Sequence, residues 1–350
     1  MKSFVDPAAT LSGQPPELGP ILARIDTGRG RENLFEDRLP ELLGSLAEDA
    51  RVASITASNA IEGVVVDGER AERIAAGSSR YRNRNEREFA GYRDATDELM
   101  RGDRYEPLSL PFVVRLHRLL FEHSGGRGGH LKSDQSLIVS YEDGGREVVF
   151  EPTPPEQTEF QLRELLVRYE ECKRAQVAHP LVLIGALALD FLAIHPVADG
   201  NGRLARLLTT QELLAQGYGV ARYVSVEQRI YESKNAYYAA LYEAQRRWHR
   251  GEHDLWPWIS YLAQVLASAY DEFEERMAVA RAWTGAKQER VREHVLRHGP
   301  SEFRRRDVER ALPGVSEATI SLVLAELRTE GRIVSEGTGR GARWRRLGGG

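Results

Sequence analysis

The chain has 350 residues, of which 41% are hydrophobic and 29% charged, with a net charge of −4. These values are ordinary for a soluble globular protein of two or three domains with a sizeable core. The single cysteine, Cys172, excludes an internal disulfide framework and is consistent with a reducing compartment.

The N-terminus lacks the apolar core of a signal peptide. The longest apolar run, residues 181–189, stops at Asp190 and is too short to span a bilayer. We therefore expect a cytoplasmic protein with no membrane partner. Residues 1–20 are proline-containing and show little periodicity, which predicts a loosely ordered lead-in.

Helical periodicity begins at residues 39–63, and two more helices are predicted at 84–100 and 109–123. The polar, arginine-rich residues 64–83 are predicted to form a loop. Two β-rich runs joined by Glu-Asp-Gly-Gly then predict a hairpin within 136–155, because these glycines supply the positive φ of a tight turn. A lone hairpin in a helical chain is expected to lie against the helices as a flap.

Helices are predicted again at 156–175, 180–194, 202–216, 227–247 and 253–280. The last segment, residues 285–350, carries 14 Lys and Arg against 9 Asp and Glu. Its pattern predicts three short helices followed by a basic hairpin, which is the layout of a winged helix-turn-helix. A basic module on an acidic body indicates contact with nucleic acid only weakly.

The stretch HPVADGNGRLAR, residues 195–206, is suited to binding a polyphosphate. Pro196 disfavours helical geometry at His195, so one helix is expected to end there and another to begin near Asn201. The unpaired N–H groups of a helix N-terminus attract an anion, and Gly200 and Gly202 allow it to approach the backbone closely. Arg203 and Arg206 are three residues apart and are expected to share one face of the first turn.

Two other side chains of this stretch have a chemistry that suits phosphate transfer. Asp199 is its only carboxylate, and Mg²⁺ is commonly held by one carboxylate together with phosphate oxygens. His195 has a near-neutral intrinsic pKa, which is suited to removing a proton from an incoming hydroxyl. Each residue alone is more often structural, but their combination in twelve positions favours a phosphate site over a plain turn.

These residues resemble the signature H-x-F-x-D/E-G-N-G-R-x-x-R of the Fic family, whose members transfer AMP from ATP to protein hydroxyls. Val197 stands where the family has Phe, a change that bears on the rigidity of the loop. The resemblance implies an all-α fold, a Fic helical bundle with a small β-hairpin flap, followed here by the C-terminal winged helix-turn-helix domain. It covers about residues 15–280.

The resemblance also implies a role for each site residue. His195 would be the general base, Asp199 the Mg²⁺ ligand and Asn201 a contact of the α-phosphate. Gly200 and Gly202 would form the anion hole, with Arg203 and Arg206 near the β- and γ-phosphates. Tyr237 and Tyr238 resemble the family's Tyr-Tyr-x-x-Leu stretch near the nucleotide base, and a core aromatic pair is the equal alternative.

A second motif, SNAIEG at 58–63, resembles the family's inhibitory motif S/T-x-x-x-E-G/N through Ser58, Glu62 and Gly63. It precedes the catalytic core, as in the class whose inhibition is intramolecular. Glu62 would pair with Arg206 in the place of the γ-phosphate, so that ATP binds unproductively. In some relatives this glutamate also assists removal of AMP, so a reverse activity is implied as well.

The sequence thus predicts a protein adenylyltransferase inhibited by Glu62, acting on a target protein docked on the flap, residues 136–151, and on itself. It would use ATP as substrate with Mg²⁺. The alternatives are a nucleotide-sensing transcriptional regulator that binds DNA through its winged helix, or transfer of another phosphate-containing group. The winged helix has DNA or another protein as its expected partner, and the oligomeric state stays open, a homodimer included. Predicted domains are 1–105, 106–280 and 285–350.

Overall fold

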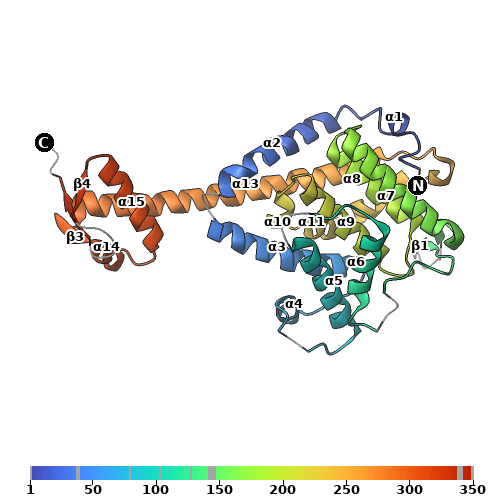
Figure 1. The fold of residues 1–350 in the computed structure, drawn as a ribbon, viewed down its shortest axis with the longest axis horizontal. Helices are drawn as coiled ribbons and strands as arrows, with labels where there is room; N and C mark the ends of the chain where they lie inside the picture. The colour runs from blue at the N-terminus through green and yellow to red at the C-terminus, as the bar shows by residue number, and fades with distance from the viewer. Residues whose placement is uncertain are drawn as a thin grey trace. The chain divides into compact units, whose positions relative to one another are not determined.

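The computed structural model describes residues 2–36, 40–78, 80–101, 105–125, 128–140, 147–336 and 342–347. The described part is mostly helical, with two small antiparallel sheets (Figure 1). It divides into two compact units, Met1–Phe273 and Glu274–Gly350. Within the described residues, none of the helices combines the length and apolar character needed to cross a membrane.

The core of the first unit is built around helix α8 (Pro180–Ile194), which is buried along nearly its whole length. Its sequence is apolar on every side, so it must be covered on all faces. Proline at its first position and the His179 side chain, which accepts from the Leu181 N–H, begin the helix. Helices α7 (Pro155–Ala175), α9 (Asn201–Ala215) and α12 (Lys234–Gln245) pack against it.

Helices of the N-terminal half complete the first unit. Helix α5 (Arg84–Met100) packs on α6 (Leu110–Phe121), and each begins at a side chain that accepts a backbone N–H, Asn83 and Ser109 respectively. The remaining elements of this unit are α1 (Pro7–Thr10), α2 (Leu18–Glu36), α3 (Pro40–Ile61), α4 (Gly68–Ala75), α10 (Val220–Tyr223), α11 (Val226–Glu232), the 3₁₀ helix η2 (Trp248–Arg250) and the start of α13 (Trp256–Glu293).

The predicted hairpin is present as strands β1 (Ile138–Ser140) and β2 (Glu147–Phe150), which pair antiparallel. Their register places Ile138 opposite Phe150 and Val139 opposite Val148. The predicted turn, residues 142–145, lies outside the described residues. Because the sheet has only two strands, its position depends on packing against the helices around it.

The second unit carries the end of α13, a short π-helix η3 (His294–His298) and an alternation of strands and helices. Strand β3 (Glu302–Arg304) precedes α14 (Arg305–Ala311) and α15 (Glu317–Thr329), and β4 (Ile333–Glu336) and β5 (Arg343–Arg346) follow. The strand order is β3-β5-β4, all antiparallel. The core of this unit consists of Val291, Val295, Phe303, Val308, Leu312, Ile320, Val323, Leu324, Leu327 and Ile333.

Several elements differ from the sequence-based expectation. Residues 64–83 contain α4, which begins where the Asp67 side chain accepts from the Glu69 N–H. The helix expected at 227–247 is divided at Ser233 into α11 and α12. Helix α13 runs without a break to Glu293, so the predicted boundary near 285 falls inside a helix. The second of the three short helices predicted in 285–350, expected at 303–312, is preceded by strand β3 and begins only at Arg305. The division into three domains stays a prediction.

The lead-in, residues 1–20, is also better ordered than expected. Phe4 is 0% exposed, and helix α1 and the start of α2 lie in this segment. The carboxylate of Asp190, in the middle of α8, accepts from the backbone N–H groups of Lys2 and Ser3, both at 2.9 Å. A buried carboxylate needs donors, and this segment supplies them, which the absence of periodicity did not indicate.

Candidate functional site

The loop between α8 and α9 carries the residues that the sequence singled out. Helix α8 ends at Ile194, as predicted, and His195 follows in the left-handed conformation with φ 54°. Gly200 has φ 90° and precedes the first residue of α9, which is why a glycine is needed there. The two helices therefore meet at a tight loop whose far end is a helix N-terminus.

Asn201 closes this loop through its side-chain amide. Its Oδ1 accepts from the Val197 N–H at 3.0 Å, and its Nδ2 donates to the Val197 carbonyl at 2.7 Å. Both residues are buried, so Val197 fills an interior position although it is smaller than the family's Phe. In this structure Asn201 thus braces the loop, and its expected contact with an α-phosphate stays a prediction.

The imidazole of His195 is held as a neutral base. Its Nδ1 lies 3.3 Å from the Leu192 carbonyl, which can only accept, so Nδ1 carries the hydrogen and Nε2 keeps its lone pair. Burial and the nearby Lys132 ammonium lower the pKa of His195 to about 4, against the opposing effects of the Leu192 carbonyl and the Glu62 and Asp199 carboxylates. The ring is therefore unprotonated at neutral pH.

Glu62 and Ser58, at the end of α3, together engage Arg206. The Glu62 Oε1 lies 2.8 Å from Arg206 Nη2, and Arg206 donates to the Ser58 hydroxyl and carbonyl at 2.8 and 3.0 Å. Burial alone would raise the pKa of Glu62, but Arg206 holds it below its ordinary value. The carboxylate is therefore ionised and paired at neutral pH.

The position of this carboxylate depends on Gly202, in the first turn of α9. A Cβ at Gly202 would lie 2.2 Å from Glu62 Oε1 and 3.2 Å from Arg206 Nη1. The missing side chain leaves a space at the helix N-terminus, and an anionic group fills it. This is the arrangement that a helix N-terminus and a guanidinium favour for any anion.

The end of α3 is fixed on two sides. Gly63 has φ 80° and directly follows the last turn, where its N–H donates to the Ala60 carbonyl at 3.1 Å. Lys234 of α12 donates from Nζ to the Ile61 carbonyl at 2.8 Å. These contacts explain the requirement for glycine at 63 and set the direction in which Glu62 leaves the helix.

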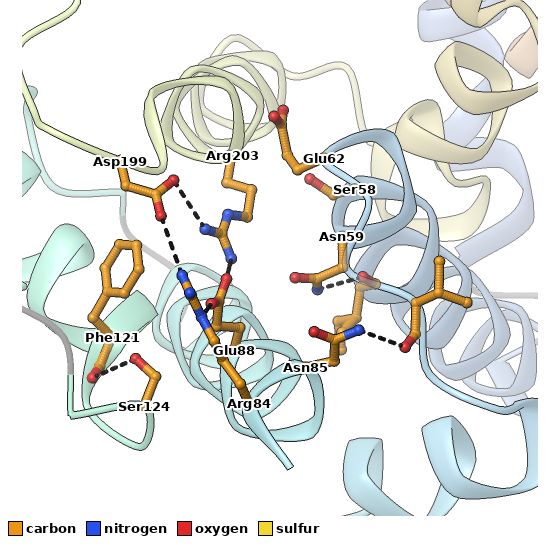
Figure 2. A network of polar contacts seen from close by, with 12 residues as sticks. Ser58, Asn59, Glu62, Arg84, Asn85, Glu88, Phe121, Ser124, Asp199 and Arg203 are labelled. Atoms are coloured by element: carbon orange, nitrogen blue, oxygen red, sulfur yellow. Dashed lines mark hydrogen bonds and ion pairs between the residues drawn. The ribbon is translucent and has the colours of Figure 1, made fainter. Parts of the chain in front are cut away.

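Arg203 points to a different partner from Arg206. Its guanidinium is 2% exposed and donates to Glu88 of α5 at 2.9 Å, and it lies 3.6 Å from the Asp199 carboxylate (Figure 2). Arg203 and Arg206 therefore bind different carboxylates in this structure, and their expected place near the β- and γ-phosphates stays a prediction. Helix α9 packs against both α3 and α5, and Glu88 lies on α5 whereas Glu62 directly follows α3, so each arginine has a carboxylate of its own.

Asp199 is accessible from solvent, with 57% of its side chain exposed. It lies 3.9 Å from Arg84, whose guanidinium also binds Glu88 at 2.6 Å (Figure 2). Among the described residues, no group of three or more His, Cys, Asp and Glu side chains could hold a metal ion. Any metal at Asp199 would thus need further oxygen ligands from a bound substrate or water.

A segment of the chain that contains this site matches a known protein family. Residues 107–213, from just before α6 to the end of α9, match the model of the Fic/DOC family. The chain therefore contains a segment that is similar to the Fic/DOC family. The matched segment contains the hairpin and the whole of the loop at His195, and we call it the Fic domain below.

Curated proteins and solved structures are similar to the chain, and three of them are described here. The "Protein adenylyltransferase and cysteine protease IbpA" of Histophilus somni (strain 2336) is 26% identical over 219 residues, which are 61% of this chain but only 5% of that protein. A Fic family protein from Desulfovibrio desulfuricans G20 is 22% identical with a TM-score of 0.63, covering 97% of this chain and 98% of its own.

A Fic domain containing signaling protein from Bacteroides thetaiotaomicron VPI-5482 is 20% identical with a TM-score of 0.60. It covers 71% of this chain and 95% of its own. At these identities the two solved structures show that the fold is shared. They support the all-α Fic fold with its small hairpin, and the expectation for the fold class of the first unit is confirmed.

The two tyrosines beyond the Fic domain differ in exposure. Tyr237 is buried and packs edge-on against Trp258, whereas nearly half of Tyr238 is exposed. Their rings contact each other with centroids 5.1 Å apart. Tyr237 is thus a core aromatic residue, whereas the exposed Tyr238 ring is available to a ligand. The role of these tyrosines at a nucleotide base stays a prediction.

Sequence reasoning missed several residues that position the site. Glu88 and Arg84 hold Arg203 and Asp199, and Lys132 contacts the loop beside His195. His117, buried in α6, accepts from the Gly129 N–H at 3.1 Å, and burial lowers its pKa to about 4. None of these residues is part of a local motif, since each acts across elements distant in sequence.

Proposed function

We propose that this protein transfers AMP from ATP to a hydroxyl of a target protein and of itself, and that Glu62 restrains the reaction. The curated relative bears the name adenylyltransferase, and its similarity to this chain extends over 219 residues. The proposal for this chain is carried by its own geometry. A neutral imidazole lies in the same loop as an anion site at a helix N-terminus.

The single observation that carries the proposal is the pairing of Glu62 with Arg206 in the space left by Gly202. A carboxylate of the protein already occupies this space, which demonstrates that it accepts a negative group. One Arg206 nitrogen, Nη1, is buried without a hydrogen-bond partner. Such an orphaned donor is costly and is suited to a second acceptor, as a phosphate oxygen would provide.

His195 would act as the general base. As the hydroxyl oxygen bonds to the α-phosphorus, Nε2 takes the hydroxyl proton, and the bond from the α-phosphorus to the oxygen that bridges to the β-phosphate breaks. Pyrophosphate leaves with that oxygen. A nearby polyphosphate raises the pKa of the imidazole above its low value in the free protein, which strengthens the base when substrate is bound.

The residues present fit a magnesium ion that arrives with the nucleotide. Asp199 offers an exposed carboxylate beside the N-terminus of α9, and one carboxylate with phosphate oxygens and water is a common Mg²⁺ environment. When bound, the ion would neutralise charge on the phosphates. Arg84 of α5 and Arg203 of α9 lie 3.9 and 3.6 Å from the Asp199 carboxylate and hold it in place.

Inhibition would arise from competition for the Gly202 space. Glu62 and a terminal phosphate cannot both occupy it. The Glu62 Oε1 already fills the space, since it lies within 2.2 Å of where a Cβ at Gly202 would be. ATP would then bind with its phosphates displaced from the productive position. Movement of the end of α3 would restore the site.

The target would dock on the flap, residues 136–151. Strand β2 belongs to a two-stranded sheet, and Val148 on it is half exposed. An extended segment can pair with a free strand edge through backbone hydrogen bonds, which would present its hydroxyl to His195. The docked chain is identified here only by this chemistry, an extended segment bearing Ser, Thr or Tyr.

The proposal is tested with the full chain and its Glu62→Gly and His195→Ala variants. Each protein is incubated with Mg²⁺ and with ATP labelled at the α- or the γ-phosphate. We expect α-label on the Glu62→Gly protein and none on the His195→Ala protein. Intact mass then distinguishes AMP from phosphate or UMP. Transfer of γ-label alone, or no transfer by Glu62→Gly, would overturn the proposal. Loss of the added AMP after ATP is removed would reveal the reverse activity.

For the second unit we propose a winged helix-turn-helix that binds another protein. Its order of strand, two helices and two strands, with pairing β3-β5-β4, supports this fold. On α15 the glutamates are already paired, Glu317 with Arg305 and Glu326 with Arg292. Leu322 is half exposed on the same helix, which suits a protein surface better than the major groove of DNA.

The alternative, a DNA-binding regulator, is favoured by the basic strand β5, in which Arg343 and Arg345 are exposed. From the sequence, Arg340, Arg343, Arg345 and Arg346 of the basic hairpin are expected to reach DNA phosphates, and Arg340 lies outside the described residues. Titration of duplex DNA against the full chain at several salt concentrations decides between the two. Binding that weakens steeply with salt supports the DNA-binding alternative, and an absence of binding excludes it.

A further inference from the structure

The last turn of α8 and the residue after His195 are held by residues on either side of the flap. The Ala193 carbonyl accepts from the Thr153 N–H at 3.3 Å, on the C-terminal side of β2. On the N-terminal side of β1, Lys132 donates from Nζ to the Ile194 carbonyl at 3.1 Å and from its backbone N–H to the Pro196 carbonyl at 2.9 Å. Lys132 therefore binds the residue before and the residue after His195.

This clamp acts on a strained position. His195 is one of few non-glycine residues with positive φ among those described, and a left-handed side-chain residue costs about 1–2 kcal/mol. Such a conformation persists only where surrounding contacts over-determine it. Two hydrogen bonds from one residue, one on each side of His195, provide that constraint.

Lys132 is also an unusual lysine. It is 5% exposed, and no ion pair joins it to a carboxylate among the described residues. Burial lowers its pKa to about 8, so it remains largely charged at neutral pH. The carbonyls at the end of α8 are the negative end of a helix dipole and partly compensate for the missing carboxylate.

We propose that Lys132 is a positioning residue for the general base, which fixes the left-handed turn at His195 and keeps a positive charge beside the imidazole so that Nε2 stays unprotonated. The proposal rests on the proposed role of His195, but its two parts, the turn and the charge, are properties of the protein without substrate. They can therefore be measured separately from the reaction.

The charged groups that act on His195 come from three places in the fold. Lys132 precedes β1 and opposes protonation, whereas Glu62 at the end of α3 and Asp199 in the same loop favour it. Burial and Lys132 prevail, and the pKa of His195 falls to about 4. Removal of the Lys132 charge is therefore expected to raise the pKa of His195 towards its ordinary value of 6.5.

Two substitutions separate the charge of Lys132 from its hydrogen bond. Lys132→Gln keeps a donor for the Ile194 carbonyl without the charge, and Lys132→Arg keeps the charge. Lys287→Gln is the control, since it removes the same charge from α13. The imidazole of His195 is followed by NMR across pH in the full chain with labelled histidine, and its signal is assigned with the His195→Ala protein.

We expect Lys132→Gln to move the midpoint of the His195 titration up by about one pH unit, the usual effect of one nearby charge. Lys132→Arg and Lys287→Gln should leave the midpoint where it is. In the Glu62→Gly background, the acidic limb of the pH profile of AMP transfer should move by the same amount. A lysine with a merely structural role would lower the rate at every pH and leave the limb unmoved.

An unchanged midpoint in folded Lys132→Gln protein overturns the proposal. If that variant does not fold, the Lys132→Arg protein decides, because a midpoint displaced despite the retained charge also overturns it. If the midpoint moves but no variant transfers AMP, the proposed function fails and the positioning of His195 by Lys132 stands. The two failures are thereby distinguished.

Discussion

Glu62 and Arg206 are 144 residues apart in the sequence, and their side chains meet at 2.8 Å at the N-terminus of α9. The meeting point is the space that a side chain at Gly202 would fill. This relationship joins the predicted inhibitory motif to the predicted phosphate site in one contact. The following predictions test it and the contacts around it.

Replacement of Glu62 by glycine should increase self-labelling by about tenfold. A partly exposed, charge-assisted bond of this kind contributes about 1.4 kcal/mol, which corresponds to a tenfold change in an equilibrium. Initial rates of transfer from α-labelled ATP measure the effect. Glu69→Gln, at an exposed glutamate of α4, is the matched control and should leave the rate unchanged. Equal rates for Glu62→Gly and the parent would refute inhibition by Glu62.

A methyl group at Gly202 should abolish transfer even after Glu62 is removed. Its Cβ would point to the position now held by Glu62 Oε1, where the proposed phosphate must bind. The double variant Glu62→Gly, Gly202→Ala is compared with Glu62→Gly in the same assay. Gly44→Ala, in α3 with open space around the added Cβ, serves as the control. Full activity of the double variant would place the phosphate elsewhere.

The pH dependence of transfer should follow His195 on the acidic side. A base must be unprotonated, so at ATP concentrations well below KM the rate of the Glu62→Gly protein should be nearly constant around neutral pH and decline as the pH approaches about 4, the pKa of His195 in the free protein. The Glu62 carboxylate raises the pKa of His195, so the Glu62→Gly substitution lowers this pKa. The substitution therefore cannot move the decline in rate to higher pH. A midpoint near 6.5 in the free protein would contradict the structure.

Asn201→Ala should lower the stability of the first unit by about 1–3 kcal/mol, because it leaves the buried Val197 N–H and carbonyl without partners. For a domain of this size, each kcal/mol corresponds to about 2–4 °C in Tm. Thermal unfolding of the full chain measures the change. Gln216→Ala, at the end of α9, is the control. An unchanged Tm would show that Asn201 does not brace the loop.

Asp190→Ala should destabilise the protein by about 3–5 kcal/mol and release its N-terminal segment. The Asp190 carboxylate accepts from Lys2, Ser3 and the Trp248 indole, and all these buried donors would lose their acceptor. Denaturant unfolding reports the stability, and limited proteolysis reports the release. Asp134→Asn, at an exposed aspartate, should change neither. Resistance of the segment to protease in Asp190→Ala would disprove the anchoring.

Local sequence patterns were sufficient for much of the fold. The end of α8 at Ile194 and the start of α9 at Asn201 follow from His-Pro and from the glycines, whose effect is on their own backbone. The bounds of α5, 84–100, were predicted from periodicity alone. The lead-in was missed because weak periodicity is overridden when tertiary contacts supply the missing hydrogen bonds, as Asp190 does for Ser3. Helix α4 was missed for another reason: residues 64–83 are polar and arginine-rich, and this composition outweighed the local signal of the Asp67 cap.

What the sequence determined by itself is the set of chemical groups, a base, a carboxylate, two arginines and a glycine-bounded helix start within residues 195–206. What only the tertiary structure decided is the partner of each group. Arg203 faces Glu88 and Arg206 faces Glu62 because α9 packs against both α3 and α5, and Lys132, which precedes the flap, binds the backbone on both sides of His195. Electrostatic partners are set by distance in space, and distance along the chain does not encode them.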